Sequence, residues 1–155
     1  MNELYNACNL CPRKCHINRN LTTGVCNNTS SIKVARSALH YFEEPSISGS
    51  NGSGTIFFSG CNLKCCYCQN KEISANNFGI NISIKRLSEL MLDLQSKKAN
   101  NINLVTPTHF VPSIIEAIKL ARRNGLNIPI VYNTSGYESV DTIKLLDGYV
   151  DIYLT

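Results

Sequence analysis

The feature of this sequence that most constrains its fold is the distribution of its cysteines. The chain has 155 residues and 8 cysteines, and the last of these is Cys68. Clustered thiols indicate metal binding or redox chemistry in a reducing compartment, and disulfides in a secreted protein. All the cysteines thus lie in the first 68 residues, where we expect the chemistry, and residues 69–155 are expected to serve as the scaffold. We predict an irregular, Cys-rich metal-binding segment over residues 1–50 and a second unit over residues 51–155.

The sequence shows no membrane span and no export signal, so we expect a cytoplasmic location. The formal net charge of +4 is spread along the sequence, so no nucleic-acid partner is predicted. No stretch reaches the roughly 20 apolar residues that a membrane-spanning helix needs. The first residues lack the basic and apolar regions of a signal peptide. We therefore expect no membrane partner.

Hydrophobic periodicity predicts an alternation of strands and helices. A short apolar strand at residues 55–59 runs directly into Gly60 and a cysteine loop. Further strands are expected at residues 32–41, 102–105, 128–132 and 150–154. Helices are expected after a capping Ser83, around Pro112 with Gly125 beyond the end, and at residues 140–146. Residues 1–30 and 46–54 are expected to be irregular.

This alternation predicts an α/β fold built on a parallel sheet. Active sites of parallel sheets and α/β barrels lie at the carboxyl ends of the strands. The cysteine loop begins at that end of the strand at residues 55–59. The last strand, at residues 150–154, has no covering helix after it, and an uncovered edge strand is not typical of a finished domain.

Three cysteines of the loop, Cys61, Cys65 and Cys68, have the spacing C-x3-C-x2-C. Three thiolates on one loop can hold three irons of a [4Fe–4S] cluster and leave the fourth iron open to a substrate or cofactor. A zinc loop is the alternative. Cys66 lies outside the spacing and is expected to be a small packing residue.

The run from Phe58 to Asn70, with Tyr67 just before the third cysteine, resembles the radical S-adenosylmethionine (radical SAM) superfamily. Within it, the chain is similar to the pyruvate formate-lyase activating enzymes, in particular their PflX-type branch. The matching stretches are residues 8–15, 34–40, 44–49, 60–65, 101–109 and 132–137. Members of this family are longer and form a partial TIM barrel. The resemblance implies that this chain supplies its first three or four βα units, as a truncated N-terminal half.

The resemblance also implies the chemistry. S-adenosylmethionine would chelate the open iron, and an electron from the reduced cluster would cleave it to methionine and a 5′-deoxyadenosyl radical, which abstracts hydrogen from a substrate. The implied partners are a reduced flavodoxin or ferredoxin-type electron donor and a protein substrate that would receive a glycyl radical.

Candidate cofactor contacts follow from the same resemblance. Tyr67 would lie near the cluster or the adenine, with packing inside the loop as the alternative. Thr106 or Thr108 stands where the superfamily often has a Gly-Gly-Glu-like motif for the methionine amino group. Asn133 and Ser135 would contact the carboxylate or ribose. Ordinary strand-to-helix turns are the alternative for both segments.

The remaining four cysteines have the spacing C-x2-C-x3-C-x10-C, and they are Cys8, Cys11, Cys15 and Cys26. Four soft ligands at short spacing suit Zn²⁺ or a second iron–sulfur cluster, and the spacing does not separate the two. Free thiols, or a partial disulfide formed under air, are the alternative. His16 is a weaker candidate ligand, whereas His40 and His109 are expected to be structural.

Three functions are compatible with these patterns. The chain is a radical SAM enzyme, or a metal-binding module without turnover of its own, or one piece of a split enzyme completed by a separately encoded C-terminal half.

Overall fold

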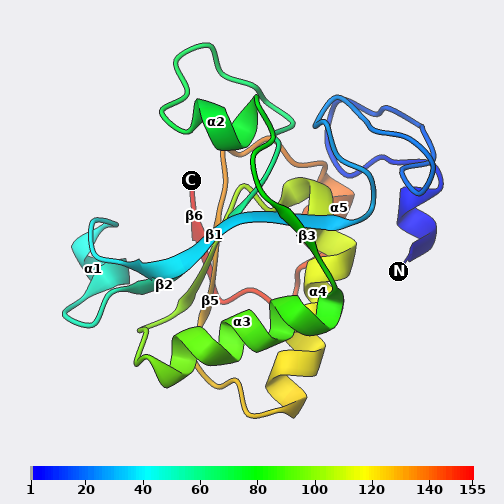
Figure 1. Ribbon diagram of the computed structural model, residues 1–155. Helices are drawn as coiled ribbons and strands as arrows, with labels where there is room; N and C mark the ends of the chain where they lie inside the picture. The colour runs from blue at the N-terminus through cyan, green and yellow to red at the C-terminus, as the bar shows by residue number, and fades with distance from the viewer. Residues whose placement is uncertain (1) are drawn as a thin grey trace.

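Six strands form one sheet in the order β3-β1-β2-β4-β5-β6 in the computed structural model, which describes residues 2–155 (Figure 1). The strands are β1 (Ile32–His40), β2 (Ser53–Phe58), β3 (Ile80–Ile82), β4 (Ile102–Val105), β5 (Ile130–Asn133) and β6 (Ile152–Leu154). The α-helices are α1 (Pro45–Ser48), α2 (Lys71–Ser74), α3 (Ile84–Ser96), α4 (Val111–Arg123) and α5 (Val140–Leu145), and the 3-10 helices are η1 (Asn2–Tyr5) and η2 (Thr108–Phe110).

The central part of the sheet is parallel, as predicted. Strands β2, β4, β5 and β6 run in the same direction, and Phe57, Val105 and Asn133 are neighbours across three of them. The α/β fold is therefore confirmed and is consistent with part of a radical SAM barrel. Because these strands end in register, the loops that follow them meet at one edge of the sheet.

The sheet as a whole is nevertheless mixed, and the pairing of the strand expected at residues 32–41 was not predicted. Strand β1 pairs antiparallel with both β2 and β3. The segment between β1 and β2 holds only the one-turn helix α1. A crossover between parallel strands usually contains a longer helix that covers the sheet, whereas antiparallel neighbours need none.

Helices α3 and α4 lie side by side against one face of the sheet (Figure 1). Ser83 caps α3 as predicted, accepting a hydrogen bond from the Arg86 amide at 3.1 Å. Pro112 lies in the first turn of α4, and Gly125 follows the helix with a φ of +99°. The apolar positions of both helices share one core with the sheet, and its buried members include Leu87, Met91, Leu94, Ile114, Ile118, Ile56 and Leu104.

Some short elements differ from the prediction. Residues 46–54 are not all loop, because α1 ends at Ser48 and β2 already begins at Ser53. The four-residue helix α2 and the three-residue strand β3 were not predicted. Elements this short do not complete the sequence periods by which helices and strands are recognised.

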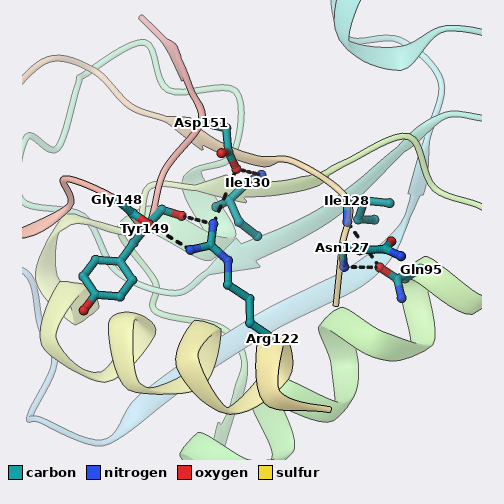
Figure 2. A network of polar contacts seen from close by, with 8 residues as sticks. All are labelled: Gln95, Arg122, Asn127, Ile128, Ile130, Gly148, Tyr149 and Asp151. Carbon is teal, nitrogen blue, oxygen red and sulfur yellow. Dashed lines mark hydrogen bonds and ion pairs between the residues drawn. The ribbon is translucent and has the colours of Figure 1, made fainter. Parts of the chain in front are cut away.

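A polar network closes the edge of the sheet opposite the cysteine loop (Figure 2). Arg122 of α4 donates to the carbonyl oxygens of Gly148 and Tyr149 at 2.8 and 3.1 Å. Asp151, 3.7 Å from the Arg122 guanidinium, accepts from the amide of Ile130 at 2.8 Å. These contacts fix the amino-terminal ends of β5 and β6. Within residues 2–155, no helix is long and apolar enough to cross a bilayer.

Candidate functional site

The cysteine loop leaves the carboxyl end of β2 through Ser59 and Gly60. Gly60 has a φ of +77°, and a Cβ at this position would overlap with the side chain of Asn28 and the carbonyl of Cys26. Glycine is therefore required both for the turn and for the close approach of the N-terminal segment. The Asn28 amide donates to the Ser59 carbonyl at 2.8 Å and holds the start of the loop.

The three cysteines of the C-x3-C-x2-C motif are half-buried residues; they are Cys61, Cys65 and Cys68. The Leu63 amide points to the Cys61 sulfur at 3.4 Å, and the Ser74 hydroxyl of α2 points to the Cys68 sulfur at 3.2 Å. Hydrogen bonds to ligand sulfurs tune the potential of an iron–sulfur cluster. The loop thus presents three thiols with donors already directed at two of them.

Cys66 and Tyr67 point away from the interior of the loop. Cys66 is exposed, so the expectation that it is a packing residue is wrong. Tyr67 is 84% exposed, which contradicts the alternative that it packs inside the loop. Its predicted contact with a cluster or an adenine stays a prediction.

The predicted cofactor contacts after β4 and β5 come together at the same edge. The Thr106 amide donates to the Asn133 carbonyl at 3.0 Å, so the two loops adjoin. Thr108 is buried, Thr106 and Asn133 are half-buried, and Ser135 is exposed. Thr106 has a φ of +56°, an uncommon conformation for a β-branched residue and one found preferentially at functional turns.

Glu138 joins these two loops, and sequence reasoning missed it. One oxygen of its carboxylate accepts from the Thr108 hydroxyl at 2.6 Å and also from the Thr134 hydroxyl. Thirty positions separate Glu138 from Thr108. Glu138 directly follows the matching stretch of residues 132–137 but lies outside it, so only the folded chain reveals the contact.

Asn103 is a second residue that sequence reasoning missed. It lies in β4 between Thr55 and Val131 of the neighbouring strands, is 0% exposed, and neither atom of its amide has a hydrogen-bond partner among the described residues. Buried amides are nearly always hydrogen-bonded. A polar residue in the otherwise apolar run of residues 102–105 is the signal that would have identified it.

The four N-terminal cysteines line a single small cavity, together with Arg13, Arg19, Asn62 and His109. Cys8 and Cys26 are buried, whereas Cys11 and Cys15 are half-buried. Burial raises the pKa of the Cys11 and Cys26 thiols, so a metal that binds them must displace their protons. His16 is exposed and is not among the residues that line the cavity.

Arg19 and His109 connect the cavity to the sheet. Arg19 is 1% exposed and donates to the backbone carbonyls of Asn28, Thr29 and His109. Burial, aided by the charge of Arg19, lowers the pKa of His109 to about 3, so its ring is neutral. The His109 Nε2 lies 2.8 Å from the Ser59 carbonyl, which can only accept, and this contact supports the predicted structural role.

The cysteine loop, the N-terminal segment and the loop after β5 meet at Asn62. The Asn62 amide donates to the Tyr137 carbonyl at 2.7 Å. The Arg13 guanidinium donates to the carbonyls of Asn62 and Leu63 at 3.0 and 3.3 Å, and it lies over the Tyr137 ring. Segments far apart in the sequence therefore hold one another at this edge.

Among residues 2–155, no group of three or more His, Cys, Asp or Glu side chains is already arranged to hold a metal ion. This includes the cysteines of both groups.

Comparison with known proteins identifies the family. The model of the radical SAM superfamily matches residues 55–155, and the chain belongs to that superfamily. The chain is 33% identical to an uncharacterized protein of Methanocaldococcus jannaschii, over 99% of this chain and 46% of that protein. The chain thus spans about half the length of this curated relative. No solved structure matches the chain.

Superfamily membership implies a [4Fe–4S] cluster and S-adenosylmethionine and supports an enzymatic function. The donor set fits the cluster, because three half-buried thiols lie on one loop and donors from Leu63 and Ser74 face two of them. The loop also begins at the carboxyl end of a parallel strand, where the active sites of such sheets lie.

Proposed function

We propose that this chain is the front part of a radical SAM enzyme of the pyruvate formate-lyase activating type, resembling its PflX branch. The observation that carries the proposal is the loop of Cys61, Cys65 and Cys68, which follows β2 in a chain of this superfamily. These three thiolates would hold a [4Fe–4S] cluster and leave one iron for the cofactor. When bound and reduced, this group supplies the electron that converts S-adenosylmethionine to methionine and a 5′-deoxyadenosyl radical.

The residues after β4 and β5 would bind and orient the S-adenosylmethionine. Thr106 or Thr108 would receive the amino group, and Asn133 and Ser135 the carboxylate or the ribose. The support for this is their shared edge of the sheet, where the Thr106 amide contacts the Asn133 carbonyl. Tyr67, exposed beside Cys68, would cover the cluster or the adenine.

The wider proposal concerns partners. A reduced flavodoxin or ferredoxin-type protein would supply the electron in the cytoplasm, and a partner enzyme would receive a glycyl radical. We also propose that a C-terminal half completes the barrel, since the curated relative is about twice as long as the part that matches this chain. Exposed apolar side chains on β6, namely Ile152 and Tyr153, favour such an addition at this edge.

The test is anaerobic reconstitution with iron and sulfide, followed by dithionite and S-adenosylmethionine. We expect 5′-deoxyadenosine and methionine in equal amounts, measured by chromatography. The Cys65→Ala variant should lose this product, because one iron loses its only protein ligand. The Cys66→Ala variant is the matched control and should keep it, because Cys66 lies outside the spacing.

A reconstituted cluster that yields no 5′-deoxyadenosine would favour the second candidate, a module or fragment that binds a cluster without turnover. In a variant that lacks all three thiols of the loop, any cluster spectrum should come from the N-terminal cysteines alone. A further cluster signal in that variant would contradict the assignment of a cluster to Cys61, Cys65 and Cys68.

A further inference from the structure

We propose that Cys8, Cys11, Cys15 and Cys26 bind a second iron–sulfur cluster, seated in the N-terminal segment outside the part of the chain that matches the superfamily. The matched residues begin at residue 55, so superfamily membership does not assign this site. The proposal is independent of which substrate the radical chemistry serves.

The first support is convergence. These four cysteines are spread over nineteen positions, yet all of them line one small cavity. Gly24 also lines it, and a Cβ there would lie 3.5 Å from the Cys15 sulfur and 3.8 Å from the Cys26 sulfur. Gly24 therefore lies close to both of these sulfurs.

The second support is charge. Arg19 is buried, and one guanidinium nitrogen lies 3.9 Å from the Cys8 sulfur. Its other acceptors are backbone carbonyls, and it forms no ion pair with a carboxylate of residues 2–155. A buried cation is costly unless an anion compensates it. A cluster with four thiolate ligands carries net negative charge and would supply that anion.

The third support concerns the kind of metal centre. The chain already belongs to a superfamily whose membership implies a [4Fe–4S] cluster. Four cysteines supply one thiolate to each iron of such a cluster and leave no iron open, whereas the loop of Cys61, Cys65 and Cys68 would leave one. This match between the number of thiolates and the number of irons favours a complete [4Fe–4S] cluster.

The proposed second site abuts the first. Asn62, directly after Cys61, lines the cavity, and the Cys26 carbonyl lies against Gly60. Arg13 also lines the cavity and donates to the Asn62 carbonyl at 3.0 Å. Filling the N-terminal cavity would therefore stabilise the segment that holds the cysteine loop in place.

The test uses the full chain with Cys61, Cys65 and Cys68 all changed to Ala, reconstituted anaerobically with iron salts and sulfide. We expect about four irons and four sulfides per chain, with the Mössbauer spectrum of a [4Fe–4S] cluster. The unaltered chain should hold about eight of each. In a chain that keeps Cys61, Cys65 and Cys68, changing Cys11 and Cys15 to Ser should lower the iron content from about eight to about four per chain. The Cys66→Ser control should keep the full content.

The proposal is overturned if the triple variant, folded by circular dichroism, retains no iron, or if purified protein holds one zinc per chain that iron does not replace. These measurements do not depend on cofactor cleavage. Loss of 5′-deoxyadenosine formation with eight irons retained would count against the proposed function and leave the second cluster supported.

Discussion

At the scale of single residues, Asn62 shows how the site is held. It is 2% exposed, its side chain donates to the Tyr137 carbonyl, and its carbonyl accepts from Arg13. The residue before it is Cys61, so these contacts fix the position of the first sulfur of the loop. A side chain that does not itself bind a metal can thus fix the position of a neighbouring side chain that would bind one.

The close approach at Gly60 gives a prediction for stability. The Gly60→Ala substitution should lower the free energy of unfolding by at least about 2 kcal/mol, measured by urea denaturation, because it adds overlap with Asn28 and Cys26 to the cost of a positive φ. Gly136→Ala is the control. Gly136 has a φ of +73° but no neighbour within 4 Å of an added Cβ, so only about 1 kcal/mol should be lost. Equal losses would contradict the close contact.

Glu138 gives a prediction for the cofactor. Its carboxylate joins Thr108 to Thr134, so Glu138→Ala should separate the loops after β4 and β5. We expect the affinity of the reconstituted protein for S-adenosylmethionine to fall about tenfold, or about 1.4 kcal/mol, measured by equilibrium dialysis. Glu116→Ala on α4, which removes only a surface pair with Lys119, is the control. Unchanged affinity in the Glu138 variant would mean that these loops do not position the cofactor.

At the scale of elements, the helices are held to the sheet at the edge opposite the site. Gln95 of α3 accepts from the amides of Asn127 and Ile128 (Figure 2). Its side chain also donates to the Gly125 carbonyl at 2.9 Å. It thus ties the end of α3 to the segment that leads into β5. The helices themselves follow from local sequence, through the capping Ser83 and the apolar positions of the 3.6-residue period.

Removing this tie should weaken the fold without changing the site. We expect Gln95→Ala to lower the free energy of unfolding by about 1 kcal/mol, because two backbone amides and one carbonyl lose their partner. Thermal unfolding monitored by circular dichroism measures the loss. Lys85→Ala on the same helix is the control, since Lys85 is exposed and forms no ion pair within residues 2–155. A loss of the same size in the control would contradict a specific role for Gln95.

At the scale of the whole molecule, the N-terminal segment is docked on the sheet and its helices. Tyr5 hydrogen-bonds to Ser113 of α4 at 2.9 Å, and the Ser139 amide donates to the Leu10 carbonyl at 3.3 Å. Most of this segment has no regular secondary structure. The predicted division of the chain at residue 50 stays a prediction, although β1 and β2 from either side of it pair in one sheet.

Iron loading should therefore stabilise the molecule as a whole. A metal centre that forms only in the folded chain shifts the unfolding equilibrium toward that chain. We expect reconstituted protein to unfold at least about 5 °C above the metal-free protein in anaerobic calorimetry. The gain should shrink when the N-terminal cysteines are changed to Ser. Identical melting temperatures with and without iron would contradict this coupling.

The sequence by itself indicated the class of chemistry and the order of the longer elements. The spacing of Cys61, Cys65 and Cys68 indicated a cluster loop, and local periodicity located α3, α4 and β4 within a residue or two. These features could be predicted because ligand spacing, capping and hydrophobic period are properties of neighbouring residues. Tertiary structure alone decided the antiparallel placement of β1, the burial of Arg19, and the contacts of Asn62 and Glu138. Those depend on residues that are distant in the chain and become neighbours only when the sheet forms, so no local pattern encodes them.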